Sequence, residues 1–403
     1  MGQIPELLAP AGNFEKLKTA LRFGADAVYL GGRNFSLRSF SDNFTRDEMQ
    51  DAVVYAHARE KKVYVTANIF AKNADFKELG DYFSFLQEIG ADAALVTDAG
   101  AFAIAKKTAP KLELHISTQA NTTNKYAARF WQEQGARRVV LARELSLAEI
   151  AEIHDFCPGL ELEAFVHGAM CISYSGRCLL SNYLDGRDSN RGACVQACRW
   201  KYFVRAENAK TETGACPVEE DDRGTYIFNS KDLNMLEYLD RLSQAGVCSF
   251  KIEGRMKSSY YLATVVNAYR RVMDKKISER EAKEELCKVA HRAFTTAYAL
   301  GKNDQTVNYT DSQESGTREY TADVLLGGEQ ALVQMRNRFR AGDELEVLSP
   351  SLNFNRTFTV EKLTDEFGEP VADAKLVMQK LYLQAPFALQ AGEILRKIKT
   401  NRG

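Results

Sequence analysis

The stretch Gly24-Ala-Asp-Ala-Val-Tyr-Leu-Gly-Gly32 sets the pattern of the fold, because it returns later in the chain in related forms. The other copies are Gly90-Ala-Asp-Ala-Ala-Leu-Val-Thr-Asp98, Gly135-Ala-Arg-Arg-Val-Val-Leu-Ala142 and, more loosely, Gly246-Val-Cys-Ser-Phe-Lys-Ile-Glu-Gly254. In each copy an amphipathic segment ends at a glycine, where a left-handed helix cap costs least. A short apolar run follows, as expected of a strand that is buried on both faces. The repeat therefore predicts helices that alternate with strands.

The rest of the first 255 residues continues this alternation. Asn13 can cap a helix that begins near Phe14, and Thr45-Arg-Asp-Glu48 fits a capping box. The predicted strands are Glu6–Ala9, Ala27–Leu30, Val63–Ala67, Ala93–Val96, Glu113–Ile116, Arg138–Leu141, Glu161–Val166 and Phe250–Ile252. Eight such units predict an α/β fold, a (β/α)8 TIM-like barrel. An open doubly wound sheet is the alternative, although no Gly-x-Gly-x-x-Gly follows the first strand.

The barrel is expected to span residues 1–300. Two further regions depart from its alternation of strands and helices. A cysteine-rich insertion at 168–230 follows the seventh strand and carries a probable hairpin, Lys201–Ala206 with Thr225–Phe228. Two helices are expected in Tyr260–Leu300, followed by a polar linker at 301–319. From 320 to 403, short alternating strands predict a small β-barrel domain. The strands expected there are Ala322–Leu326, Ala331–Gln334, Glu344–Leu348, Thr357–Lys362 and Lys375–Met378.

The overall composition is that of a globular protein. The chain has 403 residues, 45% of them hydrophobic and 27% charged, and its formal net charge is −1. This balance provides no global polycation, so any contact with RNA must come from local basic patches. The N-terminal residues lack the features of a secretion signal, and no run of about 18 apolar residues predicts a membrane span. A cytoplasmic protein is therefore expected.

Four of the eight cysteines fall close together, at Cys171, Cys178, Cys194 and Cys198, with the spacing C-x6-C-x15-C-x3-C. In a reducing compartment, clustered cysteines indicate metal or redox chemistry before they indicate disulfides. Structural zinc favours tight C-x2–4-C pairs, whereas an iron–sulfur cubane accepts more varied spacing. Iron–sulfur, zinc and inert cysteines all stay open on this evidence. The other four cysteines are scattered and are expected to be buried apolar residues.

Longer motifs identify a family. The chain resembles the collagenase-like peptidase family U32 over essentially its whole length. The motifs that carry the resemblance are Pro5-Glu-Leu-Leu-Ala-Pro-Ala-Gly12, Glu163-Ala-Phe-Val-His-Gly-Ala-Met-Cys-Ile-Ser-Tyr-Ser-Gly-Arg-Cys-Leu-Leu-Ser181, Asn190-Arg-Gly-Ala-Cys-Val-Gln-Ala-Cys-Arg199, Asn229-Ser-Lys-Asp-Leu233 and Lys251-Ile-Glu-Gly-Arg-Met-Lys257.

The resemblance implies a function that the word peptidase does not describe. Members of the family with the four-cysteine pattern resemble iron–sulfur proteins of RNA or quinone hydroxylation. It implies a tRNA uridine 5-hydroxylase that depends on prephenate and acts on the wobble uridine, with the tRNA anticodon loop as partner. It also implies that Cys171, Cys178, Cys194 and Cys198 hold a 4Fe-4S cluster.

Prephenate carries two carboxylates, which require cationic side chains. Cations are expected near the mouth of the barrel at Arg33, Arg38, Arg143, Lys231, Lys251 and Arg255, although a salt bridge explains each of them equally well. His115, His167 and Glu253 are candidates for proton transfer, and Asn68 and Gln119 for hydrogen bonds to substrate. Aromatic residues near the mouth, which could stack on an unpaired base, are Tyr29, Phe35, Phe40, Phe44, Tyr174 and Tyr183.

Two other classes of function remain as alternatives. A collagenase-like peptidase would need catalytic residues, yet the chain has neither His-Glu-x-x-His nor Gly-x-Ser-x-Gly. A non-catalytic RNA-binding or assembly partner is the third class, because some iron–sulfur members of the family work in pairs. A homo-oligomer or hetero-oligomer is expected in that case.

Overall fold

A closed barrel of eight parallel strands forms the first part of the molecule. The computed structural model describes residues 4–37, 43–200, 220–221, 224–225, 229–301 and 316–399. The barrel strands are β1 (Glu6–Pro10), β2 (Ala27–Gly31), β3 (Lys62–Ala67), β4 (Ala93–Val96), β5 (Glu113–Ile116), β6 (Arg138–Val140), β7 (Glu161–Ala169) and β11 (Val247–Ile252). The last strand, β11, pairs in parallel with both β7 and β1 and so closes the ring. The predicted TIM-like barrel is confirmed, and the open sheet was the wrong alternative.

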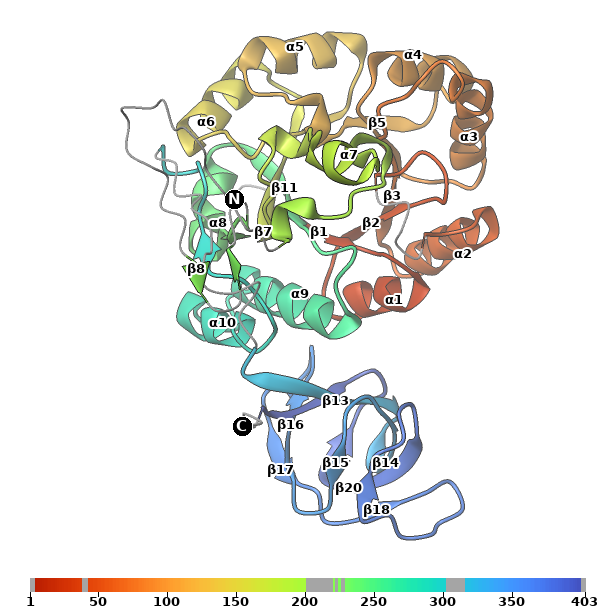
Figure 1. Ribbon diagram of the computed structural model, residues 1–403, viewed down its shortest axis with the longest axis vertical. Helices are drawn as coiled ribbons and strands as arrows, with labels where there is room; N and C mark the ends of the chain where they lie inside the picture. The colour runs from red at the N-terminus through yellow and green to blue at the C-terminus, as the bar shows by residue number, and fades with distance from the viewer. Residues whose placement is uncertain are drawn as a thin grey trace. The chain divides into compact units, whose positions relative to one another are not determined.

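Helices connect these strands, and their ends lie where the sequence places them. They are α1 (Phe14–Arg22), α2 (Arg46–His57), α3 (Phe76–Glu88), α4 (Ala99–Thr108), α5 (Lys125–Gln134), α6 (Leu147–Phe156) and α8 (Leu239–Gln244). Figure 1 shows α3 to α6 on the outside of the strands. Thr45 and Glu48 form the predicted capping box, and Asn13 Oδ1 accepts from the Lys16 N–H at 2.9 Å. The repeated glycines at 24, 90, 135 and 246 all have positive φ, as the helix-cap interpretation requires.

The segment between β7 and β11 leaves the barrel pattern, as predicted. β10 (Asp232–Asn234) pairs antiparallel with the end of β7, and β12 (Phe294–Thr295) pairs with β10. The four-cysteine segment contains one α-helix, α7 (Leu180–Asp185), and short 3-10 turns at Tyr174–Gly176, Ser189–Arg191 and Ala197–Arg199. β8 (Glu220–Asp221) pairs antiparallel with β9 (Gly224–Thr225). Apart from Thr225, the expected hairpin lies outside the described residues.

Packing divides the chain into two compact units. One comprises Met1–Leu17, Asp26–Met256 and Arg292–Glu314, and the other Lys18–Ala25, Lys257–His291 and Ser315–Gly403. The second unit includes the two predicted helices, α9 (Ser259–Met273) and α10 (Glu279–Leu286). The expected domain boundaries at 300 and 320 stay predictions, and the expected linker falls mostly outside the described residues. Its last two residues, Arg318 and Glu319, already belong to a strand.

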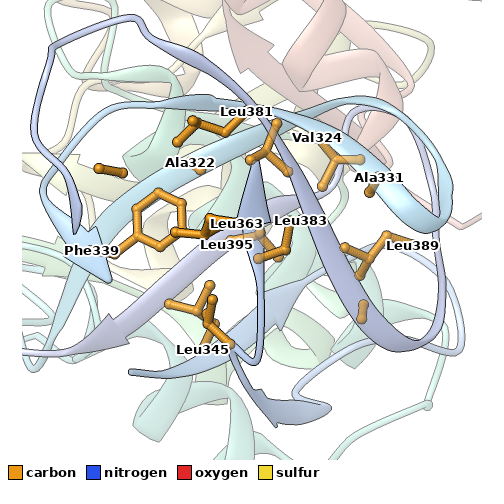
Figure 2. Close-up of a cluster of buried hydrophobic side chains, with 14 of the residues drawn as sticks. Ala322, Val324, Ala331, Phe339, Leu345, Leu363, Leu381, Leu383, Leu389 and Leu395 are labelled. Carbon is orange, nitrogen blue, oxygen red and sulfur yellow. The ribbon is translucent and has the colours of Figure 1, made fainter. Parts of the chain in front are cut away.

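An antiparallel sheet of seven strands forms the C-terminal part, in the order β17-β16-β21-β13-β14-β20-β18. The strands of this region are β13 (Arg318–Leu326), β14 (Gly328–Met335), β15 (Phe339–Arg340), β16 (Glu344–Leu348), β17 (Thr357–Thr359), β18 (Leu363–Thr364), β19 (Asp373–Ala374), β20 (Lys380–Leu389) and β21 (Ile394–Ile398). Their inward side chains make one apolar core, which Figure 2 shows around Phe339, Leu345 and Leu383.

One strand predicted for this sheet is wrong. Residues 375–378 form no strand, and Leu376 and Val377 are 65% and 75% exposed. The strand follows at β20, which the sequence interpretation had missed. Among the described residues, no helix has the length and apolar character that crossing a membrane requires.

Candidate active site at the barrel mouth

Charged side chains lie inside the barrel towards the N-terminal ends of its strands, which is the end opposite the mouth. Arg138 donates to Glu6 Oε1 at 2.8 Å and to Glu163 Oε2 at 3.1 Å. Ser249 Oγ donates to both carboxylates, and the Tyr64 hydroxyl donates to Glu6 at 2.7 Å. Burial raises the pKa of Glu163, but Lys251 and Arg138 outweigh this effect and hold it at about 2. The network thus forms a floor beneath the mouth in which Glu163 and Arg138 are charged at pH 7.

Two of the expected site residues belong to this floor. Lys251 is 3% exposed, and its Nζ donates to Glu163 Oε1 at 2.7 Å. His115 is fully buried, and its ring meets the Tyr64 ring edge-on at a centroid distance of 4.9 Å. Burial lowers the pKa of His115, so this ring is neutral at pH 7. His115 is the third of the four residues of β5, and its contact with Tyr64 brings its ring to the charged floor.

At the mouth, Arg255 is the most deeply embedded cation. It is 4% exposed, and its guanidinium donates to Ser36 Oγ at 2.9 Å, Thr66 Oγ1 at 3.1 Å and Asn43 Oδ1 at 3.1 Å. A Cβ on Gly31 would lie only 2.7 Å from Arg255 Nη1, so glycine is what leaves room for this side chain. Arg255 therefore links the loop after β2 and the end of β3 to the loop after β11.

Amide and hydroxyl groups converge beside it. Asn68 Nδ2 donates to Ser117 Oγ at 3.2 Å and to Gln119 Oε1 at 3.4 Å, so the predicted pair Asn68 and Gln119 is brought together. Of the proton-transfer candidates, Glu253 is half-buried and accepts from the Tyr29 hydroxyl at 3.4 Å. His167 is 2% exposed, and its backbone oxygen accepts from the Glu253 N–H at 2.8 Å. Glu253 and His167 thus occupy adjacent strand ends.

Arg143 makes fewer hydrogen bonds than Arg255. Its Nη1 donates to Ala169 O at 3.0 Å, and its guanidinium lies 3.9 Å from the centroid of the Phe165 ring. Its Nε is buried and has no hydrogen-bond partner among the described residues. Arg33 is exposed and Lys231 is half-buried, whereas Arg38 lies outside the described residues.

The four cysteines are half-buried free thiols on the segment that follows β7. The Leu180 N–H donates to Cys178 Sγ at 3.3 Å, and the Gln196 N–H donates to Cys194 Sγ at 3.4 Å. Burial raises the pKa of Cys198, and so do the neighbouring thiols of Cys171 and Cys194, while Arg199 lowers it. Within the described ranges, no group of three or more His, Cys, Asp or Glu side chains is arranged so that it could hold a metal ion.

The cysteine segment is fastened to three loops of the barrel mouth. Arg191 makes two hydrogen bonds to Asp75, at 2.7 and 2.9 Å, after β3. The Arg177 Nε donates to Gln119 O at 2.8 Å after β5. The Ser175 N–H donates to Glu144 Oε1 at 2.6 Å after β6, and the Ser175 hydroxyl donates to the same carboxylate. In Figure 1, α7 accordingly lies within the ring of outer helices.

Sequence interpretation missed several residues of this site. The floor carboxylates Glu6 and Glu163 and their partner Arg138 were not singled out. The sequence feature that could have revealed them is a charged residue at an inward-facing position of a strand that is otherwise apolar. The hydroxyl partners of Arg255 carried no comparable signal, because serine is common in loops such as that of Ser36 and threonine is common in strands such as that of Thr66.

The chain was compared with known families and proteins. The model of peptidase family U32 matches residues 12–309, and the model of its C-terminal domain matches residues 317–396. The tRNA hydroxylation protein P1 of Bacillus subtilis is 39% identical over 98% of this chain and 95% of its own length. The tRNA hydroxylation protein P of Escherichia coli is 37% identical over 91% of each chain. The 23S rRNA 5-hydroxycytidine C2501 synthase of Escherichia coli is 36% identical over 68% of this chain and 40% of its own length.

Proposed function

The chain belongs to peptidase family U32, and we propose that it is an iron–sulfur tRNA hydroxylase that converts the wobble uridine to 5-hydroxyuridine with prephenate as co-substrate. The observation that carries the proposal is the four-cysteine segment held across the mouth of the barrel, where TIM-like enzymes place their chemistry. The names of the relatives support RNA hydroxylation. Two of them are tRNA hydroxylation proteins that share nearly the whole length of the chain.

The cysteine segment offers four thiols, which is the number of ligands that a 4Fe-4S cluster takes, although the described part of the structure does not gather them around a metal site. The cluster would be held by Cys171, Cys178, Cys194 and Cys198. The backbone N–H groups that donate to Cys178 Sγ and Cys194 Sγ are of the kind that adjusts the reduction potential of such a cluster. When bound, a 4Fe-4S cluster supplies one-electron chemistry. Ligation requires the thiolate form of Cys198, and burial raises the pKa of this thiol in the structure, an effect that Arg199 only partly opposes.

Arg143 is the best candidate ligand for a prephenate carboxylate. Lys251 already neutralises Glu163, and Arg255 already donates to three side chains. Arg143 lies in the loop after β6, and its Nε is buried. Its Nη1 contacts Met170 Sδ, at the start of the cysteine segment. Glu253 and His167, whose backbones are bonded to each other on neighbouring strand ends, are the candidates for proton transfer at the same mouth.

Analysis of iron, sulfide and tRNA nucleosides tests the proposal. Protein purified without oxygen should contain roughly four iron and four sulfide per chain. A strain that lacks the protein should lose 5-hydroxyuridine from its tRNA, and the wild-type gene should restore it. Cys171→Ala should abolish both iron binding and restoration. Cys248→Ala is the matched control, because Cys248 lies on β11 and donates to Leu162 O. Full iron and full activity in Cys171→Ala would refute the proposal.

A further inference from the structure

Apolar side chains on the cysteine segment face solvent. Leu179 is 75% exposed and Tyr183 is 86% exposed, and these two residues are four positions apart at the start of α7. Residues with this spacing are neighbours on a helix surface. Tyr174 and Trp200 are also exposed, at 55% and 41%. The one buried residue of α7 is a serine, Ser181, and the exposed residues include the apolar Tyr183 and Leu184 together with Asn182 and Asp185.

The aromatic residues near the mouth separate clearly by exposure. Tyr29 and Phe44 are 4% and 2% exposed, and the Phe35 ring packs against the Tyr82 ring at 5.2 Å. Phe40 lies outside the described residues. Of the six aromatics that the sequence suggested for base stacking, Tyr174 and Tyr183 are therefore the described ones with open faces.

The charge of this surface suits a polyanion. Residues 170–200 contain four arginines, at 177, 187, 191 and 199, against two aspartates, at 185 and 188. Arg191 is bonded to Asp75, but Arg177 is exposed, and its Nε bonds only a backbone oxygen in the structure. Exposed aromatic faces beside arginines are the combination with which proteins hold unpaired nucleotides.

The surface is also firmly positioned. Tyr174 O accepts from Asn121 Nδ2 at 3.4 Å, and Ser175 and Arg177 are bonded to Glu144 and Gln119. These contacts hold the backbone around Tyr174 beside the mouth before any ligand binds. A platform that is built before the ligand arrives loses less conformational entropy in the complex.

We propose that Tyr174, Leu179 and Tyr183 form a stacking platform for unpaired nucleotides of an RNA loop, which holds the loop while one base enters the barrel mouth. This inference rests on the proposed function, since it specifies how the RNA substrate of that site is held. The platform recognises single-stranded RNA, because paired bases have no free faces to stack.

RNA binding by the full-length protein tests the platform. The probes are an anticodon stem–loop RNA with uridine at the wobble position and a fully paired duplex of similar length. Tyr183→Ala should weaken binding of the stem–loop about tenfold or more and leave duplex binding unchanged. Tyr183→Phe should restore stem–loop binding because it keeps the aromatic face. In turnover, Tyr183→Ala should raise KM for tRNA, with little change in kcat or in bound iron.

Tyr126→Ala is the matched control, because Tyr126 is 69% exposed but lies on the outer helix α5. Equal stem–loop binding by Tyr183→Ala and Tyr126→Ala would overturn the platform and favour a protein partner for this surface. If wild-type protein hydroxylates tRNA while that result holds, the proposed function stands without the platform. If binding depends on Tyr183 but no hydroxylation occurs, the platform stands and the proposed function fails.

Discussion

At the scale of single residues, the mouth cations differ in how many of their donors are already used. Lys251 is held by Glu163, and Arg255 spends its guanidinium on hydroxyl and amide oxygens. Arg143 instead stacks on Phe165 and keeps a buried Nε without a partner among the described residues. A buried donor without a hydrogen-bond partner destabilises the protein. A substrate carboxylate that accepts from this donor therefore gains more binding free energy than a carboxylate that binds at the surface.

Arg143→Lys should therefore impair the enzyme although it preserves the charge. Lysine cannot reproduce the planar fork or the stacking on Phe165. Hydrogen bonds to charged groups are worth about 1.5–3 kcal/mol, so kcat/KM for prephenate should fall about tenfold or more. Steady-state kinetics with prephenate as the varied substrate measures this. Arg33→Lys, at an exposed position of another mouth loop, should change little. Equal effects of the two variants would contradict a direct role for Arg143.

The sequence predicted which residues gather at the site better than it predicted how far each one lies from the mouth along the barrel axis. The four cysteines, Asn68 with Gln119, and Arg143 all lie at the mouth as expected. His115 and Lys251 lie on the correct strands but one layer lower. Alternation along a strand tells which side chains point inward, whereas their height depends on the stagger of neighbouring strands in the closed barrel. That stagger is a property of the assembled sheet.

At the scale of elements, the cysteine segment depends on a few polar anchors rather than on an apolar core. The strongest is the paired contact of Arg191 with Asp75, whose side chain is 14% exposed. The hydrogen bonds from Arg191 lower the pKa of Asp75 to about 2. Because the carboxylate is more acidic in the folded protein, its contribution is present above its unfolded pKa near 4 and is lost as the pH falls towards 2.

Asp75→Asn should loosen this segment at neutral pH. The substitution removes the charge that pairs with Arg191, and we expect a loss of about 1 kcal/mol, because the pair is partly exposed to solvent. Trypsin cleavage after Arg187 and Arg191 should accelerate. The difference from wild type in urea-unfolding free energy should shrink as the pH is lowered from about 4 to about 2.

Asp185→Asn is the control for this anchor, because Asp185 lies on the same segment and makes only a 3.9 Å contact with Arg187. It should leave both proteolysis and unfolding unchanged. A difference between wild type and Asp75→Asn that persists below pH 2 would show that the effect does not come from this carboxylate.

Elements with a strong local pattern were predicted, and elements that depend on context were not. The eight barrel strands stand out as apolar runs after glycine caps, and all are confirmed. In the C-terminal sheet, the apolar run at 375–378 was mistaken for a strand. The real strand, β20, contains Pro386, which weakens its strand signal. The ladder tolerates this proline because the pairing of β20 with β14 is irregular in that region.

At the scale of the whole molecule, the division into two units does not follow the order of the chain. The unit with the C-terminal sheet also holds α9 and α10. A fully buried arginine explains this grouping, because Arg396 on β21 contacts Glu285 on α10 at 2.6 Å and Glu346 on β16 at 2.6 Å. Lys288 bonds the same two carboxylates at 2.8 Å. The burial of Arg396 could not be predicted from the sequence, since partners so distant along the chain leave no local pattern.

Arg396→Leu should destabilise this unit as a whole. The substitution leaves Glu285 with one of its two cationic partners in a buried position, and breaking a buried pair costs about 3–5 kcal/mol. Hydrogen–deuterium exchange should increase in both α10 and the sheet, because one interaction joins them. Lys397→Leu is the control, since Lys397 lies 3.6 and 3.9 Å from its carboxylate neighbours and otherwise donates to the backbone oxygen of Arg338. Adding Glu285→Leu to Arg396→Leu should recover part of the loss, because the uncompensated charge is removed. Faster exchange in the sheet alone would mean that α10 is held by other contacts and that the buried arginine does not unite this unit.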